Sequence, residues 1–190
     1  MRSRRYGMFR HSERLTDAIV LCGGLGERLR PVTEQIPKVM ITLGGRPLVE
    51  WQMRWLMKCG VERIVFACGY LYEKIEDFAK RSNLKAQFLF SIEKERMGTS
   101  GAIKQALSMI KGDSAYVLNG DVLCSLNLTE LAAFHSLMGK VGTITVTQLR
   151  SPYGICESIT GVLERFVEKP LLPHWVNAGI YIFNKNIAPS

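Results

Sequence analysis

The sequence predicts an α/β fold in which a mainly parallel β-sheet carries helices on both faces. Short, continuous apolar runs, typical of strands buried on both faces, alternate along the chain with longer amphipathic segments typical of helices. Such alternation indicates βαβ units, whose crossovers are right-handed almost without exception. The 190 residues, 47% of them hydrophobic, suffice for one domain with a sizeable core.

The elements follow one another in a regular order. The first strand is predicted over residues 18–22, and a glycine- and proline-rich turn follows over 23–38. Pro47 suits the first turn of a helix that we expect to end near Gly60. The alternation then continues with strand 64–68, helix 73–80, strand 86–92, helix 98–110, strand 115–118, helix 128–138 and strand 142–149.

Beyond residue 149 the pattern changes to strand-rich segments, predicted over 153–156, 161–167 and 175–183. The sequence contains no internal repeat and no low-complexity segment, and we find no linker that would mark a second domain. No apolar run is long enough to span a bilayer, so we expect no membrane partner. The five cysteines are scattered without a C-x-x-C pair, which favours a reduced, cytoplasmic setting.

The formal net charge of +8 is concentrated in part at the N-terminus, where residues 1–16 contain five arginines and one glutamate. That segment lacks the apolar core of a signal peptide, and we expect it to be a flexible extension. A nucleic-acid-binding arm is an alternative, but no aromatic platform or known module accompanies the arginines, so we expect no nucleic-acid partner. A positive net charge also suits an enzyme with anionic substrates.

The turn over residues 23–38 has the composition of a polyphosphate-binding loop. Its glycines allow backbone N–H groups to approach a phosphate closely. Arg28 can bind phosphate oxygens bidentately, Lys38 adds a second cation, and Pro31 and Pro37 stiffen the loop. The dinucleotide fingerprint fails at Leu29 and the P-loop motif is absent, which leaves an ordinary turn with two solvated basic residues as the alternative.

Further candidates follow other predicted strands, where sites in open α/β sheets lie. Asp121, after Asn119-Gly120, is a candidate Mg²⁺ ligand, although Asn-Gly-Asp is also ordinary turn chemistry. Glu168 and Lys169 suit a sugar phosphate, because a lysine can hold the phosphate while a carboxylate accepts hydrogen bonds from ring hydroxyls. An exposed ion pair of little energetic value is the alternative there.

The turn resembles the signature of the sugar-phosphate nucleotidyltransferases, G-x-G-x-R-L-x-P-x-T-x-x-x-P-K. The matching positions are Gly24, Gly26, Arg28, Leu29, Pro31, Thr33, Pro37 and Lys38, whereas Glu27 stands where the family usually has Thr or Ser. The N-G-D motif at 119–121 and the E-K-P motif at 168–170 also resemble the family, and the resemblance runs from residue 18 to 183.

The resemblance implies a Rossmann-like three-layer α/β/α sandwich, the nucleotidyltransferase (GT-A-like) fold with an inserted β region. It also implies the reaction of an NTP with a sugar 1-phosphate to give an NDP-sugar and pyrophosphate. The implied catalytic residues are Arg28, Lys38, Asp121 with Mg²⁺, and Lys169. The implied nucleotide-binding residues are Leu21, Gly23, Gly24, Gly26, Glu93, Gly98 and Thr99, and the implied sugar-phosphate-binding residues are Gly154, Glu168, Lys169 and Asn177.

Base choice is predicted from Glu93, which stands five residues before Gly98, where uridylyl- and thymidylyltransferases of the family tend to have Gln. A carboxylate can accept hydrogen bonds from both N1–H and the 2-amino group of guanine. With the G-T-x-G-A run at Gly98, Thr99, Gly101 and Ala102, the loop most resembles that of mannose-1-phosphate guanylyltransferases. Glu95 could share this role, and a solvated strand-end acid is the structural alternative.

Three alternatives remain open: a glucose-1-phosphate uridylyl- or thymidylyltransferase, a non-catalytic regulatory relative that binds nucleotide or sugar nucleotide, and a basic nucleic-acid binder. The presence of all three motif cations (Arg28, Lys38 and Lys169) and of Asp121 favours the enzyme over the regulatory relative. Relatives usually carry a second metal-binding aspartate in a later segment. We therefore expect residues 17–190 to be a catalytic domain without its C-terminal part, with slow turnover and a tendency to form homo-oligomers.

Overall fold

The computed structural model describes residues 14–95 and 97–187. The expectation of a flexible extension over residues 1–16 falls mainly on residues outside this range. Two compact units are present: the first contains the described residues up to Thr143 and those from Ile180 onward, and the second is Ile144–Gly179. None of the described helices is both long and apolar enough to cross a membrane.

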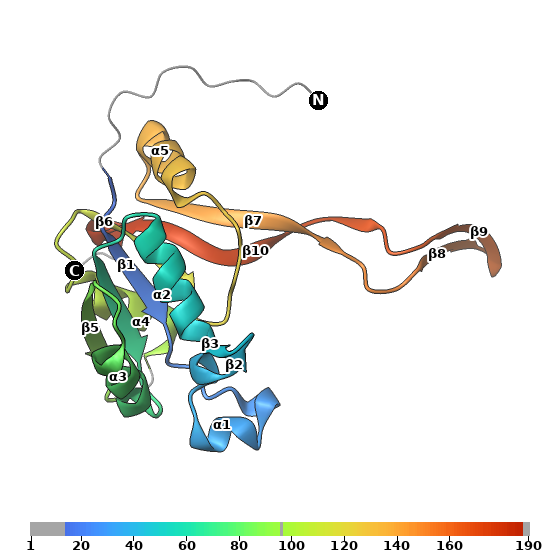
Figure 1. The fold of residues 1–190 in the computed structure, drawn as a ribbon. Coiled ribbons are helices and arrows are strands. Elements are labelled where there is room, and N and C mark those ends of the chain that lie inside the picture. The colour runs from blue at the N-terminus through green and yellow to red at the C-terminus, as the bar shows by residue number, and fades with distance from the viewer. Residues whose placement is uncertain (1–13, 96, 188–190) are drawn as a thin grey trace. The chain divides into compact units, whose positions relative to one another are not determined.

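A six-stranded sheet forms the centre of the first unit (Figure 1). Its strand order is β5-β4-β1-β6-β10-β7, and β5, β4, β1 and β6 run parallel, whereas β10 is antiparallel to β6. Leu21, the last residue of β1, lies opposite Ala67 of β4 and Asn119 of β6, so β1 and β6 end at the same level and β4 ends one residue later. The strands are β1 (Asp17–Leu21), β4 (Arg63–Cys68), β5 (Gln87–Ile92), β6 (Ser114–Asn119), β7 (Gly142–Arg150) and β10 (Leu171–Asn184).

Helices cover both faces of this sheet because successive strand residues point to opposite sides. Ala18 and Val20 of β1 belong to a buried cluster with α2 (Leu48–Lys58), α3 (Tyr72–Arg81) and α5 (Leu128–Met138). Ile19, between them in the chain, belongs to a second cluster with α4 (Gly98–Leu107). The predicted α/β fold with a mainly parallel sheet is therefore confirmed.

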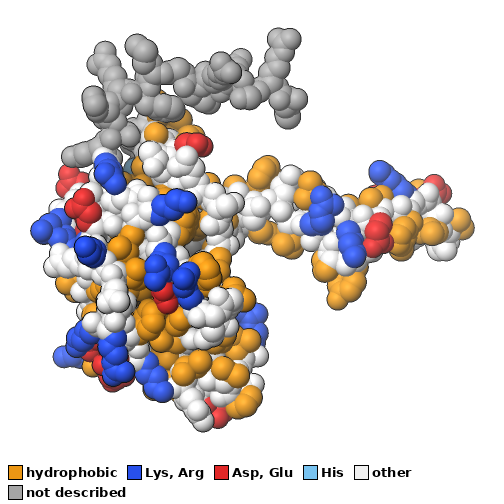
Figure 2. Space-filling view, in the orientation of Figure 1, with side chains coloured by type: hydrophobic (Ala, Val, Ile, Leu, Met, Phe, Trp, Pro, Cys, Tyr) orange, Lys and Arg blue, Asp and Glu red, His pale blue; other side chains and the backbone are white. Residues whose placement is uncertain are grey.

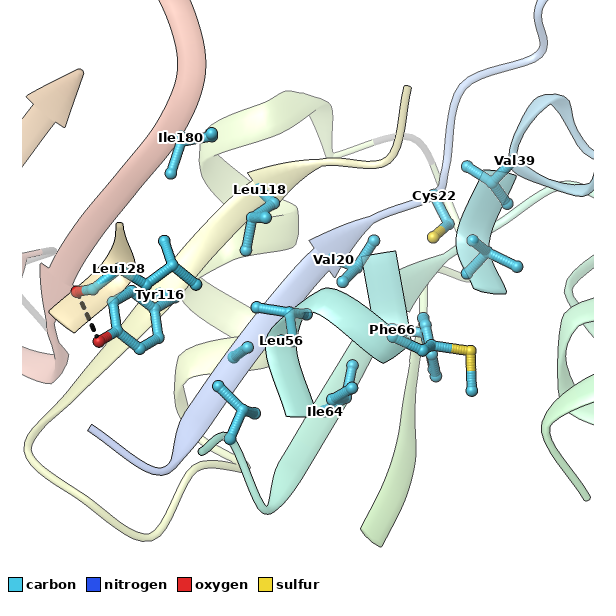
Figure 3. Packing of buried hydrophobic residues seen from close by; sticks show 14 of the residues in the cluster. Val20, Cys22, Val39, Leu56, Ile64, Phe66, Tyr116, Leu118, Leu128 and Ile180 are labelled. Carbon is cyan, nitrogen blue, oxygen red and sulfur yellow. Dashed lines mark hydrogen bonds between the residues drawn. The ribbon is translucent and has the colours of Figure 1, made fainter. Parts of the chain in front are cut away.

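The first cluster packs apolar side chains from neighbouring strands against α2 (Figure 3). Figure 3 shows Val20, Ile64 and Leu118 of three adjacent strands near Leu56, and all four side chains are fully buried. The Tyr116 hydroxyl in the same cluster donates to the Leu128 carbonyl oxygen at 2.9 Å. This bond joins the sheet to the first turn of α5, and Asn127 caps that turn by accepting from the amide of Thr129 at 3.0 Å.

Several predicted boundaries differ from the structure for local reasons. The predicted helix 98–110 ends at Leu107, because the amides of Ser108 and Met109 bond to carbonyls three residues back and so tighten the last turn. The strand predicted over 153–156 starts at Ile155, since Tyr153 is bonded to Ser151 in a local turn. The turn over 23–38 also contains short helices that we did not predict: η1 (Glu27–Leu29), α1 (Val32–Gln35) and η2 (Lys38–Met40, shared with the next segment).

Two short hairpins and one short helix complete the fold. In the first unit, β2 (Thr42–Leu43) pairs with β3 (Arg46–Pro47). The short helix η3 (Lys185–Ile187) follows β10. In the second unit, β8 (Ile155–Ile159) pairs with β9 (Val162–Val167) through a turn in which Thr160 and Gly161 both have positive φ. Large hydrophobic side chains are exposed on this hairpin (Figure 2); they are Ile155, Ile159, Val162, Leu163 and Phe166.

Candidate active site

A pocket of about 940 Å³ lies where β1, β4 and β6 end. Its walls come from the turn after β1, the segment after β5 with the start of α4, and the segment after β6. Ten of the residues predicted from the sequence line it: Leu21, Gly23, Gly24, Gly26, Arg28, Lys38, Glu93, Gly98, Thr99 and Asp121. Their roles stay predictions, but segments up to 100 residues apart in the chain meet at this one edge of the sheet.

The turn after β1 is held by Gly26 and Thr33. Gly26 has φ +64°, and a Cβ there would lie 2.8 Å from the Thr33 methyl carbon and 3.3 Å from Lys38 Cβ. The buried Thr33 hydroxyl donates to the Gly26 carbonyl oxygen at 2.9 Å. Thr33 was recognised in the signature but not predicted as a site residue, and its position in the signature was the available signal. Gly24, in contrast, has open space where a Cβ would project.

Lys38 and Asp121 form an ion pair between Nζ and Oδ2 in the pocket, and both side chains are partly exposed. Gly120 makes this approach possible: a Cβ on it would lie 2.6 Å from the Leu21 carbonyl oxygen and 2.6 Å from a Val39 methyl carbon. Its amide donates to that Leu21 oxygen at 2.9 Å. The glycine of the Asn-Gly-Asp sequence is therefore required by close packing of the chain against β1 as well as by turn chemistry.

Glu93 lies beside the turn after β1. Its Oε1 would be 3.3 Å from a Cβ on Gly23, and its Oε2 accepts from the Met97 amide at 3.3 Å. Gly98, with φ +67°, opens α4. Glu95, the alternative base-reading residue, is not among the described residues that line the pocket. The carboxylate at position 93 is thus held at the pocket with lone pairs left for further donors.

The residues predicted for the sugar phosphate belong to the second unit. A Cβ on Gly154 would lie 2.3 Å from the Phe166 ring and 3.1 Å from Glu168 Oε2, so these residues are neighbours. Lys169 has φ +43°, and its Nζ lies 3.9 Å from Glu168 Oε1 with both side chains mainly exposed. The Asn177 side-chain oxygen accepts from the Gly179 amide at 2.9 Å.

The metal-binding capacity of the pocket rests on Asp121. Among the described residues, no three His, Cys, Asp or Glu side chains come together as ligands for one ion. Mg²⁺ commonly takes one or two carboxylates and completes its shell with phosphate oxygens and water. The exposed Asp121 carboxylate, next to a phosphate-binding type of loop, therefore fits a divalent ion shared with a polyphosphate, and does not fit one held by protein ligands alone.

Cys22 also lines the pocket but is unsuited to act as a nucleophile. A hydrogen bond with Cys68 and burial raise the pKa of the Cys22 thiol well above its ordinary value. The thiol thus stays protonated near neutral pH, and the thiolate is the reactive form. The chemistry of the pocket is left to its cations, its carboxylates and its backbone amides.

Comparison with known proteins gives a consistent result. The sequence matches the family model described as nucleotidyl transferase over residues 17–189. It is 37% identical over 183 residues to mannose-1-phosphate guanyltransferase of Schizosaccharomyces pombe, covering 90% of this chain and 50% of the relative. It is 36% identical over 177 residues to mannose-1-phosphate guanylyltransferase catalytic subunit beta of Xenopus tropicalis, covering 88% of this chain and 49% of the relative.

Among solved structures, that of HddC from Yersinia pseudotuberculosis complexed with GMP-PN is similar. The TM-score is 0.72 at 30% sequence identity, with 93% of this chain and 81% of that chain covered. The chain spans about half the length of the two curated relatives.

Proposed function

The chain belongs to the nucleotidyl transferase family, and from this premise we propose that it transfers a nucleoside monophosphate from an NTP to a sugar 1-phosphate. The products are an NDP-sugar and pyrophosphate. The observation that carries the proposal is the pocket that Arg28, Lys38 and Asp121 line together with a glycine-rich turn. This combination of cations, backbone amides and one carboxylate suits a triphosphate with its metal ion.

The reaction is an in-line displacement at the α-phosphorus. An ionised oxygen of the sugar 1-phosphate forms the new P–O bond while the bond to pyrophosphate breaks, so no general base is required. In the proposal, Arg28 neutralises the β- and γ-phosphates and the departing pyrophosphate, and Lys38 neutralises charge near the reacting phosphorus. Both cations are partly or fully accessible in the pocket, which suits charge stabilisation rather than a structural role.

We propose Mg²⁺ as the divalent ion, with Asp121 as its protein ligand; when bound, the ion withdraws charge from the phosphates. Lys38, the ion-pair partner of Asp121, would then bind a phosphate oxygen in place of that carboxylate. Backbone amides at Gly23, Gly24 and Gly26 would donate to phosphate oxygens. The proposed metal ligand and the proposed phosphate-binding cation are thus neighbours in the pocket.

For the second substrate, we propose that Lys169 holds the phosphate of the sugar 1-phosphate and that Glu168 accepts hydrogen bonds from ring hydroxyls. Asn177 and the backbone at Gly154 would contact the sugar. Three of these residues are neighbours within the second unit: Glu168 lies beside both Gly154 and Lys169.

GTP and mannose 1-phosphate are the proposed substrates. Two relatives of similar sequence are named mannose-1-phosphate guanyltransferase or guanylyltransferase, and a similar solved structure is described as a GMP-PN complex. Glu93 supports guanine, because one carboxylate can accept from two adjacent donors of that base while Oε2 also accepts from Met97. The five free cysteines suit a reducing compartment such as the cytoplasm.

The test is a pyrophosphate-release assay of the 190-residue chain with four NTPs, each combined with mannose 1-phosphate and glucose 1-phosphate. Release should require both substrates and a divalent ion, and GTP with mannose 1-phosphate should give the highest kcat/KM. Arg28→Ala serves as the matched blank for contaminating activity. Release with UTP or dTTP in preference to GTP would overturn the substrate assignment, and no release with any pair would overturn the proposed reaction.

A further inference from the structure

Gln52 is a fully buried polar residue on the apolar face of α2. It is 0% exposed, and its neighbours on that face, Val49, Met53 and Leu56, are also 0% exposed and belong to the main core cluster. Glutamine is seldom fully buried, and a buried polar group requires hydrogen-bond partners. The partners of Gln52 therefore indicate why an amide stands at this position.

Both hydrogen bonds of Gln52 reach the segment that carries Asp121. Its Nε2 donates to the Asn119 carbonyl oxygen at 2.8 Å and to the Val122 carbonyl oxygen at 2.7 Å. The Val122 amide in turn donates to the Asn119 oxygen at 3.2 Å, so residues 119–122 form a four-residue turn. The single amide of Gln52 thus joins the first and last residues of the turn in which Asp121 is the third.

The turn is also tied to the sheet at its second residue. The Gly120 amide donates to the Leu21 carbonyl oxygen at 2.9 Å, and no side chain larger than hydrogen fits between Gly120 and that oxygen. With residues 119, 120 and 122 held, the Asp121 side chain is directed to Lys38 and the pocket. Gln52 supplies two of the bonds that hold this geometry.

The other polar atom of the Gln52 side chain carries a cost that an apolar residue would avoid. Its Oε1 is buried and has no hydrogen-bond partner among the described residues. An orphaned buried oxygen is destabilising, and an apolar side chain of similar length would remove it. A buried polar atom without a partner is expected where function requires a particular side chain.

We propose that Gln52 is a positioning residue for Asp121: by bonding both ends of the 119–122 turn, it places the carboxylate where it can hold the metal ion of a metal–nucleotide substrate. The proposal rests on the proposed function for its metal step, whereas the fixing of the turn follows from the hydrogen bonds alone. Gln52 touches neither substrate nor metal and acts only through Asp121.

The test substitutes Gln52→Met, which keeps the length of the side chain and removes the donor and the orphaned oxygen. Leu56→Met, one turn later on the same buried face, is the matched control. Binding of the Mn²⁺–GTP complex to the chain is measured by the enhancement of water-proton relaxation, which distinguishes protein-bound Mn²⁺ from Mn²⁺ held by GTP alone. Gln52→Met should weaken Mn²⁺ binding about 10- to 100-fold, as substitutions of residues that orient a metal ligand do. Leu56→Met should leave Mn²⁺ binding unchanged.

Two further measurements separate positioning from general stability. Hydrogen exchange at residues 119–122 should be faster in Gln52→Met than in wild type, but unchanged in Leu56→Met. The two variants are compared under conditions in which their melting temperatures are equal. In an Asp121→Asn background, Gln52→Met should change Mn²⁺ binding less than about twofold, because its effect passes through the missing carboxylate. Should Gln52→Met fail to fold, Gln52→Asn provides the same comparison with a side chain too short to reach both carbonyls.

The outcomes distinguish this proposal from the proposed function. Wild-type Mn²⁺ affinity in Gln52→Met, or exchange at residues 119–122 equal to that of Leu56→Met, would overturn the positioning role while the reaction stands. If the wild-type chain bound no Mn²⁺–GTP, the proposed function would fail, and the exchange measurement would still decide whether Gln52 holds the turn.

Discussion

Replacing Gly26 by alanine should destabilise the turn after β1 (residues 23–38) by an amount that its contacts allow us to estimate. The left-handed conformation at φ +64° costs a residue with a Cβ about 1–2 kcal/mol. The new methyl group would also lie 2.8 Å from the Thr33 methyl carbon, and overpacking of this kind costs about 1–3 kcal/mol. Together the unfolding free energy should fall by about 2–5 kcal/mol, since Thr33 is buried and cannot turn away without losing its bond to Gly26.

The assay is thermal unfolding followed by calorimetry, with nucleotide binding measured in parallel by titration calorimetry. For a chain of this size, roughly 2–4 °C per kcal/mol gives an expected fall in Tm of about 4–20 °C. Gly24→Ala is the matched control in the same loop, because nothing lies within 4 Å of its added Cβ and no positive φ is recorded for it. Gly24→Ala should leave Tm within about 2 °C of wild type yet weaken GTP binding, because the open space beside Gly24 is where we place a phosphate.

A Tm for Gly26→Ala within about 1 °C of wild type would refute the steric reasoning about the loop. Equal falls in Tm for both variants would also refute it, because the two glycines would then not differ in the way their surroundings indicate. Unchanged GTP binding in Gly24→Ala would remove that residue from the phosphate site.

Three further predictions concern catalysis, base choice and pH. Arg28→Ala and Lys38→Ala should each lower kcat about 10²- to 10³-fold while Tm changes little, because exposed cations add little stability; near-normal turnover would remove that residue from the mechanism. Glu93→Gln should lower kcat/KM for GTP about 10- to 100-fold and favour UTP or dTTP, and a competition assay that still selects GTP would contradict this. Burial raises the pKa of Tyr116 from its ordinary value near 10 to about 12. Because the unfolded chain then loses this proton first as pH rises, stability should decrease between about pH 10 and 12 by about 2–3 kcal/mol. Tyr116→Phe should lack this decrease in urea titrations across that range; an identical decrease would contradict it.

The predicted α/β fold was confirmed because the signals for it are local. Continuous apolar runs indicate strands buried on both faces, and the structure buries all six residues of β4. The helix predicted over 128–138 has the same bounds in the structure, since Asn127 caps one end and Gly139, with φ +58°, ends the other. Short helices inside the turn after β1 were missed, because glycine and proline punctuation conceals a single helical turn.

The candidate site was predictable in its residue types and unpredictable in its contacts. Motif positions in the turn after β1 and at 119–121 indicate phosphate and metal chemistry without a structure. The residues that hold those positions in place were not predicted from the sequence: Thr33 fixes Gly26, and Gln52 holds the turn around Asp121. A buried glutamine in a helix reads as an ordinary helix residue, since its partners lie 67 and 70 positions away.

By itself the sequence determined the main strands and longer helices, the turn that carries the glycines and cations, and the candidate acids. These follow from periodicity and from backbone preferences that act over a few residues. The tertiary structure alone decided that Lys38 pairs with Asp121, 83 residues away, and that Gly120 must lack a side chain. The physical reason is the parallel register, which sets Leu21 opposite Asn119 and so brings the ends of β1 and β6 into contact. Strand register depends on the packing of the whole sheet, and no local run of residues encodes it.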